Sequence, residues 1–171
     1  MGESVIPEAA QGGLLALALV ISANAAPVLA HLLLGRALSW PVDGGRCWRD
    51  GRRILGASKT WRGLVVSLAS TAALSAWWLG DAWTGLLVAA LAMAGDLASS
   101  FAKRRRGLRS GADAPGLDQL PESLLPLLAL RGPLALGAGE AFAVALAFLV
   151  LDLIGTRLLA GLRARRAPPG A

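Results

Sequence analysis

The sequence has very little of what a histidine- or cysteine-based active site needs. Its 171 residues include one cysteine, Cys47, one histidine, His31, and no tyrosine. A single cysteine excludes an internal disulfide, and a single histidine excludes a metal site built from several histidines. Any metal bound by this chain would therefore be held by oxygen ligands.

Charged residues are also scarce. They make up 16% of the chain, whereas soluble domains carry about 25%. Hydrophobic residues reach 55% and the mean hydropathy is +0.57, which predicts a protein that lies in the lipid bilayer. The formal net charge is +6, but the Lys and Arg residues fall between apolar runs, so nucleic acid is not expected as a partner.

The apolar runs predict an all-α integral membrane protein with about five transmembrane helices, forming a single membrane-embedded domain over residues 1–171. The first run is long enough, at about 1.5 Å per residue, to cross a hydrocarbon core of about 30 Å. The fourth run is the weakest, because prolines, Glu122 and Arg131 interrupt it. The expected spans are roughly 12–34, 64–79, 82–101, 117–136 and 138–160.

The first run could instead be a cleaved signal peptide, but the residues before it include Glu3 and Glu8 and neither Lys nor Arg. Basic residues gather in two loops, 36–62 and 103–118, and in the tail after Ala160, with seven, five and three of the 17 Lys and Arg residues. Because such residues are retained in the cytoplasm, we expect an outside N-terminus, cytoplasmic loops and C-terminus, and a multi-pass protein of the cell membrane.

The stretch from Gly95 to Glu122 holds the residues with the most chemical potential. On a helix, Asp96, Ser99, Ser100 and Lys103 are spaced i, i+3, i+4 and i+7, which puts a carboxylate, two hydroxyls and an ammonium on one face. An aspartate near the centre of a span costs roughly 2.5 to 3.5 kcal/mol, so such residues are usually paired or functional. This face suits a metal-bound polyphosphate.

Other charged residues allow two interpretations. Asp118 follows a Pro-Gly turn and could cap the fourth helix or bind a ligand, and these roles are compatible. Lys59 and the basic block at 103–106 could bind phosphate or anchor the chain at the cytoplasmic face, and anchoring is preferred for Arg105 and Arg106. We expect Asp43, Asp50 and Asp113 to be solvated loop acids, each close enough in sequence to help hold a metal. Asp152 is expected to pair with Arg157 or reach the inner interface.

Four segments of the chain form a distinctive series: NAAP at 24–27, PVDGG with DGRRILG within 41–56, KTWRG at 59–63, and GD, SFAKRR and PGLDQLP within 95–121. Together they resemble the CDP-archaeol synthases, a branch of the CTP:lipid-phosphate cytidylyltransferases. The resemblance implies a Mg²⁺-dependent transfer of CMP from CTP to a membrane lipid phosphate, ether- or ester-linked, giving a CDP-lipid and pyrophosphate.

The resemblance also implies roles for single residues. Asp96 and Asp118 would be the metal ligands, and Lys103 would act with them in catalysis. In one departure, Pro121 stands where bacterial phosphatidate cytidylyltransferases often have a second acid, and Glu122 lies one residue out of register. The residues expected to contact CTP are Lys59, Thr60, Arg62, Ser100 and Arg104.

This chemistry fits a chain that is poor in histidine and cysteine. A lipid phosphomonoester has a second pKa near 6, so at neutral pH it is already a nucleophilic dianion and needs no general base. Mg²⁺ and basic side chains would supply positioning and charge neutralisation. The alternatives are a small transporter or channel with Asp96 and Asp152 along a polar path, and a non-catalytic relative that binds anionic lipid through its basic loops.

Overall fold

The computed structural model describes residues 8–112 and 114–166 of the chain, so Asp113 lies outside the described residues. They form five helices and no strand, apart from two isolated bridges, Pro41 with Thr60 and Cys47 with Arg53. The predicted all-helical fold is therefore confirmed for the described residues. The helices are α1 (Glu8–Leu34), α2 (Trp61–Leu79), α3 (Ala82–Arg105), α4 (Gln119–Ala129) and α5 (Ala138–Arg166).

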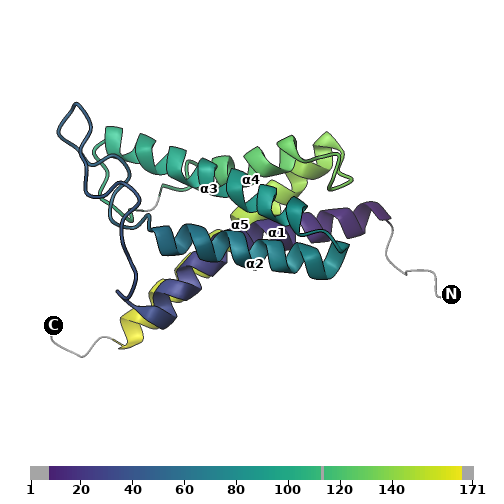
Figure 1. Cartoon of the computed structure of the whole chain (residues 1–171), viewed down its shortest axis with the longest axis horizontal. Helices are drawn as coiled ribbons and strands as arrows, with labels where there is room; N and C mark the ends of the chain where they lie inside the picture. The colour runs from purple at the N-terminus through teal and green to yellow at the C-terminus, as the bar shows by residue number, and fades with distance from the viewer. Residues whose placement is uncertain (1–7, 113, 167–171) are drawn as a thin grey trace.

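The helices pack along one another, and the long loop between α1 and α2 lies at the end of the molecule where α3 finishes (Figure 1). Buried apolar side chains from α1, α3, α4 and α5 form one core, which includes Leu19, Val88, Leu127 and Phe148. Hydroxyl groups add bonds between helices: Ser67 Oγ of α2 donates to the Ala23 carbonyl oxygen of α1 at 2.7 Å. Such bonds and small residues are typical of helix packing in membranes.

The turn between α2 and α3 is short because both helix ends are capped. Gly80 has a left-handed backbone with φ of 70° and ends α2. Asp81 begins α3 by accepting hydrogen bonds from the backbone N–H groups of Trp83 and Thr84, at 2.9 and 3.0 Å. This is the tight turn that the sequence predicts around Gly80 and Asp81, and it makes α2 and α3 an antiparallel pair.

Within the described part of the chain, three helices are long and apolar enough to cross a membrane: Gln11–Leu34, Ala82–Arg105 and Ala138–Leu158. They correspond to the first, third and fifth expected spans. Helix α2 has 19 residues and covers the second. The number of crossings and the side on which each end of the chain lies stay predictions.

The fourth expected span, 117–136, differs from the structure. Helix α4 has 11 residues, which at about 1.5 Å per residue give about 16 Å, roughly half of a hydrocarbon core. The helix ends at Ala129, before Gly132 and Pro133, because proline lacks the N–H group that a continuing helix needs. Helix α4 begins beside the middle of α3, since Gly95 contacts Pro121 there.

We expect Gly85→Ala to destabilise the protein. A Cβ at this position would lie 2.5 Å from the Ser75 Cβ and against the Thr71 backbone of α2, so α2 and α3 would have to separate. Overpacking of this kind costs about 1–3 kcal/mol. In Gly155→Ala, a control on α5 with no atom within 4 Å of the new Cβ, stability should be kept. Thermal unfolding in detergent measures the stability of both variants. Equal unfolding midpoints for Gly85→Ala and Gly155→Ala would contradict the close α2–α3 contact.

Candidate functional site

The first ion pair of the site joins the long loop to the middle of α3. Lys59 Nζ lies 2.6 Å from Asp96 Oδ1, and the two side chains are 23% and 17% exposed. The Ser99 hydroxyl, predicted to share the Asp96 face, donates to the Asp96 carbonyl oxygen at 2.9 Å. The carboxylate that the sequence singled out is therefore paired with a lysine that lies 37 residues earlier in the chain.

The second ion pair joins the end of α3 to the turn before α4. Lys103 Nζ lies 2.7 Å from Asp118 Oδ1 and donates to the Ala112 carbonyl oxygen at 3.0 Å. Asp118 stands at the N-cap position of α4, but its side chain makes no capping bond there. Its Oδ2 instead accepts from the Ala114 N–H at 3.0 Å. The expected capping bond of Asp118 is therefore not made, and its role as a ligand stays a prediction.

A close helix contact brings the two pairs together. A Cβ on Gly95 would lie 2.5 Å from the Pro121 carbonyl carbon and 2.8 Å from the Glu122 nitrogen, so only glycine allows α3 and α4 to approach this closely. Glu122, in the first turn of α4, is buried with 7% exposure. It lies within electrostatic range of Asp96, Asp118, Asp152 and Lys59.

A further acid reaches the same region from α5. Asp152 Oδ2 accepts a hydrogen bond from Gln119 Nε2 at 2.8 Å. The expected pairing of Asp152 with Arg157 is not found among the described ion pairs. The buried Gln119 has no ionisable group, and sequence analysis gave it no role. Its place in the motif DQLP was the signal that could have identified it.

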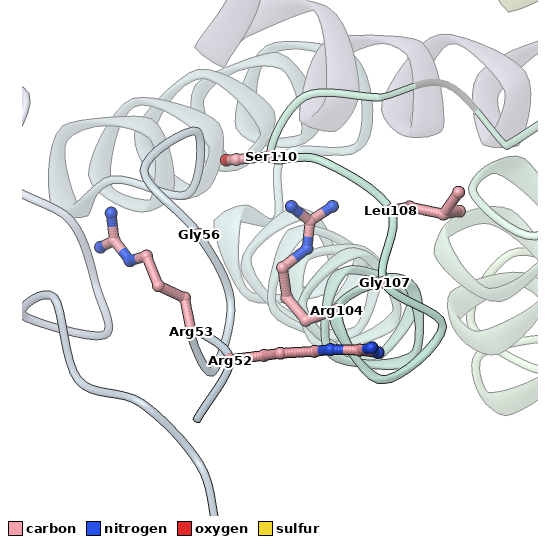
Figure 2. Close-up of a pocket in the computed structure, with 7 residues that line it drawn as sticks. All are labelled: Arg52, Arg53, Gly56, Arg104, Gly107, Leu108 and Ser110. Carbon is pink, nitrogen blue, oxygen red and sulfur yellow. The ribbon is translucent and has the colours of Figure 1, made fainter. Parts of the chain in front are cut away.

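A basic cavity of about 340 Å³ lies between the two loops (Figure 2). The Arg104 side chain extends between Gly56 of the first loop and Ser110 of the second, and Arg52 extends toward Gly107. The Nε atoms of Arg53 and Arg104 are buried without a hydrogen-bond partner in the described part of the chain. Buried guanidinium donors of this kind suit phosphate oxygens. The residues that line the cavity are Arg52, Arg53, Gly56, Arg104, Gly107, Leu108 and Ser110.

Asp43 holds the first loop in shape and is not the solvated residue that we expected. Its side chain is fully buried and accepts from Arg53 and from the backbone N–H groups of Gly45, Leu55 and Gly56, the last at 2.8 Å. Burial alone would raise the pKa of Asp43, but the hydrogen bonds from Arg53 and these N–H groups outweigh it and lower the pKa to about 2.

Two further contacts fix the loops against each other. Gly56 has φ of +104°, and a Cβ there would lie 2.6 Å from Ser110 Oγ of the second loop. The Arg105 guanidinium binds Asp50 and the carbonyl oxygens of Arg52 and Arg53, the latter at 2.6 Å. Arg105 thus connects α3 to the first loop, and its expected anchoring at the cytoplasmic face stays a prediction.

The remaining predicted nucleotide contacts lie in different places. Thr60 caps α2, with its Oγ1 accepting from the Gly63 N–H at 3.1 Å. The Arg62 guanidinium donates to the carbonyl oxygens of Ala37 and Gly35, the second at 3.1 Å, and so binds the chain just after α1. Ser100 is buried on α3, with 2% exposure. Contacts of these residues with CTP stay predictions.

The carboxylates of the site can be compared with the ligands that a magnesium ion usually takes. Within the described ranges, no three His, Cys, Asp or Glu side chains are grouped so that they could hold a metal. Mg²⁺ usually binds through one or two carboxylates together with substrate phosphates and waters. Asp96 and Asp118, each beside a lysine, fit an ion that arrives with a polyphosphate.

Comparisons with known proteins agree with the motifs. The family model described as CarS-like, CDP-archaeol synthase, matches residues 14–78 and 73–162. The CDP-archaeol synthase of Thermococcus gammatolerans is 47% identical over 109 residues, covering 57% of this chain and 60% of the relative. That of Hyperthermus butylicus is 40% identical over 123 residues, covering 68% and 70%. The chain thus spans about 60% of the length of the first of these relatives.

A solved structure gives the same picture in three dimensions. It is described as an intramembrane enzyme for archaeal membrane lipids biosynthesis. Its TM-score is 0.70 and its sequence identity 36%, with 84% of this chain and 91% of that chain covered. The shared fold and the apolar helices together show that this chain is a membrane protein.

We expect Asp43→Asn to lower the stability of the protein at neutral pH. The folded-state pKa of about 2 lies below the ordinary value of about 3.9, so the Asp43 carboxylate stabilises the folded state above pH 4 and stops doing so as the pH falls toward 2. The contribution is about 2 kcal/mol. Thermal unfolding in detergent should show that the unfolding temperature of wild type falls between pH 7 and pH 3. The fall should be smaller in Asp43→Asn.

The control for this measurement is Asp50→Asn. Asp50 also binds an arginine, but its side chain is 38% exposed, so its substitution should have a smaller effect at pH 7. The assigned role of Asp43 is wrong if Asp43→Asn unfolds at the same temperature as wild type at pH 7.

Proposed function

The chain belongs to the CarS-like CDP-archaeol synthase family, and from this premise we propose that it transfers CMP from CTP to the phosphate of a membrane lipid. The observation that carries the proposal is the pair of lysine–aspartate contacts, Lys59–Asp96 and Lys103–Asp118, beside a cavity lined by three arginines. This arrangement supplies cations for phosphate oxygens and carboxylates for a divalent ion at one place.

In the proposed reaction, an oxygen of the lipid phosphate attacks the α-phosphorus of CTP. The bond from this phosphorus to the oxygen that bridges to the β-phosphate breaks, and pyrophosphate leaves with that electron pair. The attacking phosphate is a dianion at neutral pH, so no residue has to remove a proton from it. Catalysis then depends on alignment and on neutralising charge.

The basic cavity is the proposed site for the part of CTP that leaves as pyrophosphate. Arg104 is buried at the end of α3, one residue after Lys103, so the cavity adjoins the second ion pair. Its unpartnered Nε, and that of Arg53, would donate to β- and γ-phosphate oxygens.

Asp96 and Asp118 are the proposed ligands for Mg²⁺. When bound, the ion would neutralise charge on the triphosphate. Lys59 and Lys103 lie within 2.7 Å of these carboxylates, so both ammonium groups stand where phosphate oxygens would meet the acids. Lys103 also holds the Ala112 carbonyl, which limits its movement.

The site lies where a lipid headgroup and a cytosolic nucleotide could meet. Asp96 is nine residues before the end of α3, while the basic cavity lies at that end. We place this end at the cytoplasmic face of the cell membrane, with five crossings, the N-terminus outside and the C-terminus inside. The short α4, after the second loop, would complete the fourth crossing (Figure 1).

We expect Asp96→Asn and Asp118→Asn each to lower turnover at least about 100-fold, because each removes a proposed ligand of the Mg²⁺ ion that would neutralise charge on the triphosphate. Lys59→Ala should raise the KM for CTP about tenfold. The assay is pyrophosphate release by purified protein in liposomes with CTP and Mg²⁺, comparing phosphatidic acid, an archaeal-type ether lipid phosphate and no lipid. Lipid-dependent release should stop when Mg²⁺ is chelated.

The matched control is Asp81→Asn, which alters an aspartate at the opposite end of α3 and keeps a good helix cap. It should turn over like wild type. Normal activity in Asp96→Asn would refute the ligand assignment, and ion flux without CTP consumption would instead support a transporter.

Glu122→Gln tests whether the buried Glu122 compensates for Pro121. Glu122 lies within electrostatic range of Asp96, so if it helps to hold the metal, its loss should weaken Mn²⁺ binding in the presence of CTP about tenfold. Electron paramagnetic resonance of Mn²⁺ measures the affinity without turnover. Glu122→Asp should bind more tightly than Glu122→Gln, and wild-type affinity in Glu122→Gln would exclude this role.

A further inference from the structure

We propose that Asp152 of α5 is a positioning residue for the reaction: it holds Gln119, and through Gln119 it fixes the turn that carries Asp118. Asp152 takes part in neither lysine–aspartate pair, and no role for it follows from the motifs. The inference rests on the proposed function, because its consequence is the position of a proposed metal ligand.

The Gln119 side chain connects two parts of the chain. Its Nε2 donates to Asp152 Oδ2 at 2.8 Å, and its Oε1 accepts from the Gly116 N–H at 2.9 Å. A carboxylate is acceptor-only and a backbone N–H is donor-only, so both bonds require the same orientation of the amide. Gln119 is 7% exposed, and a buried amide that lost either partner would be costly.

The turn before α4 is held together by its own bonds. Asp118 N donates to the Ala114 carbonyl oxygen at 3.1 Å, and Asp118 Oδ2 accepts from the Ala114 N–H at 3.0 Å. Leu120 N donates to the Gly116 carbonyl oxygen at 3.1 Å. Because these bonds make the turn one unit, fixing Gly116 from α5 also fixes the backbone of Asp118.

Helix α4 needs such an external support. It has 11 residues and no side-chain capping bond at its start, and a helix of this length is marginal by itself. The contact with Gly95 of α3 supports one side of its first turn. The Gln119–Asp152 bond supports it from α5, so the start of α4 is held between two long helices.

Asp152 lies where a charged side chain is costly, so its bond to Gln119 is not expected to be incidental. It lies within the apolar stretch Ala138–Leu158, and an aspartate near the centre of a span costs roughly 2.5 to 3.5 kcal/mol. Among the described residues, Gln119 is the one whose side chain bonds to it. Both lysines of the site are already paired with Asp96 and Asp118.

The test compares Asp152→Leu, Asp152→Asn and Gln119→Leu in liposomes with CTP, Mg²⁺ and lipid phosphate. Asp152→Leu should raise the KM for CTP about tenfold and leave the KM for the lipid within about twofold. The reason is that Asp118, which it would displace, is a proposed ligand of the Mg²⁺ ion that binds with CTP. Asp152→Asn should stay within about threefold of wild type, since its Oδ1 can still accept from Gln119. Thr156→Val, one turn further along α5 and exposed, is the control and should be unchanged.

Gln119→Leu should resemble Asp152→Leu, and the double variant should be no worse than either, because both remove the same bond. Equal losses in Asp152→Asn and Asp152→Leu would overturn the proposal, since Asp152 would then act by its charge. A wild-type KM for CTP in Asp152→Leu would also overturn it.

Failure of the proposed function would be seen separately, as no lipid-dependent pyrophosphate release by wild type. The bond remains testable in that case by thermal unfolding in detergent, which requires no substrate. Non-additive midpoint changes for positions 119 and 152 support the connection, and additive changes refute it.

Discussion

The cost of placing charge among apolar helices is the constraint on which this site depends. Asp96 lies within α3 and Asp118 at the start of α4, and each is tolerated among apolar helices because a lysine lies within 2.7 Å. The lysine beside Asp96 comes from the first loop, so the same charge pair also folds that loop onto α3. The groups proposed for chemistry therefore hold the structure together before any substrate binds.

Close backbone contacts give these charges their positions. Gly95 lets α4 approach α3 beside Asp96, and Gly56 lets the first loop meet Ser110 of the second. Neither contact supplies a functional group. Each brings together segments that are far apart in the sequence, and the basic cavity and the two lysine–aspartate pairs lie near these contacts.

The sequence predicted what depends on local pattern and missed what depends on long-range contact. Hydropathy located the long helices, and helical spacing placed Asp96 and Lys103 on one face. The length of α4 was overestimated because the length of an apolar run does not show where a helix within it begins or ends. Asp43 looked like a solvated loop residue, since nothing local shows that N–H groups two to thirteen residues away would surround it.

The charge balance indicates why nucleotide and metal would bind together under the proposed function. Polyphosphate alone would meet Asp96 and Asp118, so its attraction to the arginines would be offset by repulsion. A divalent cation alone would have to displace Lys59 and Lys103 from their carboxylates. If the two bound together, the cation would pair with the carboxylates and the phosphates with the ammonium groups, so each charge that lost a partner would gain another. The coupling follows because unpaired charge is most costly in a low-dielectric site.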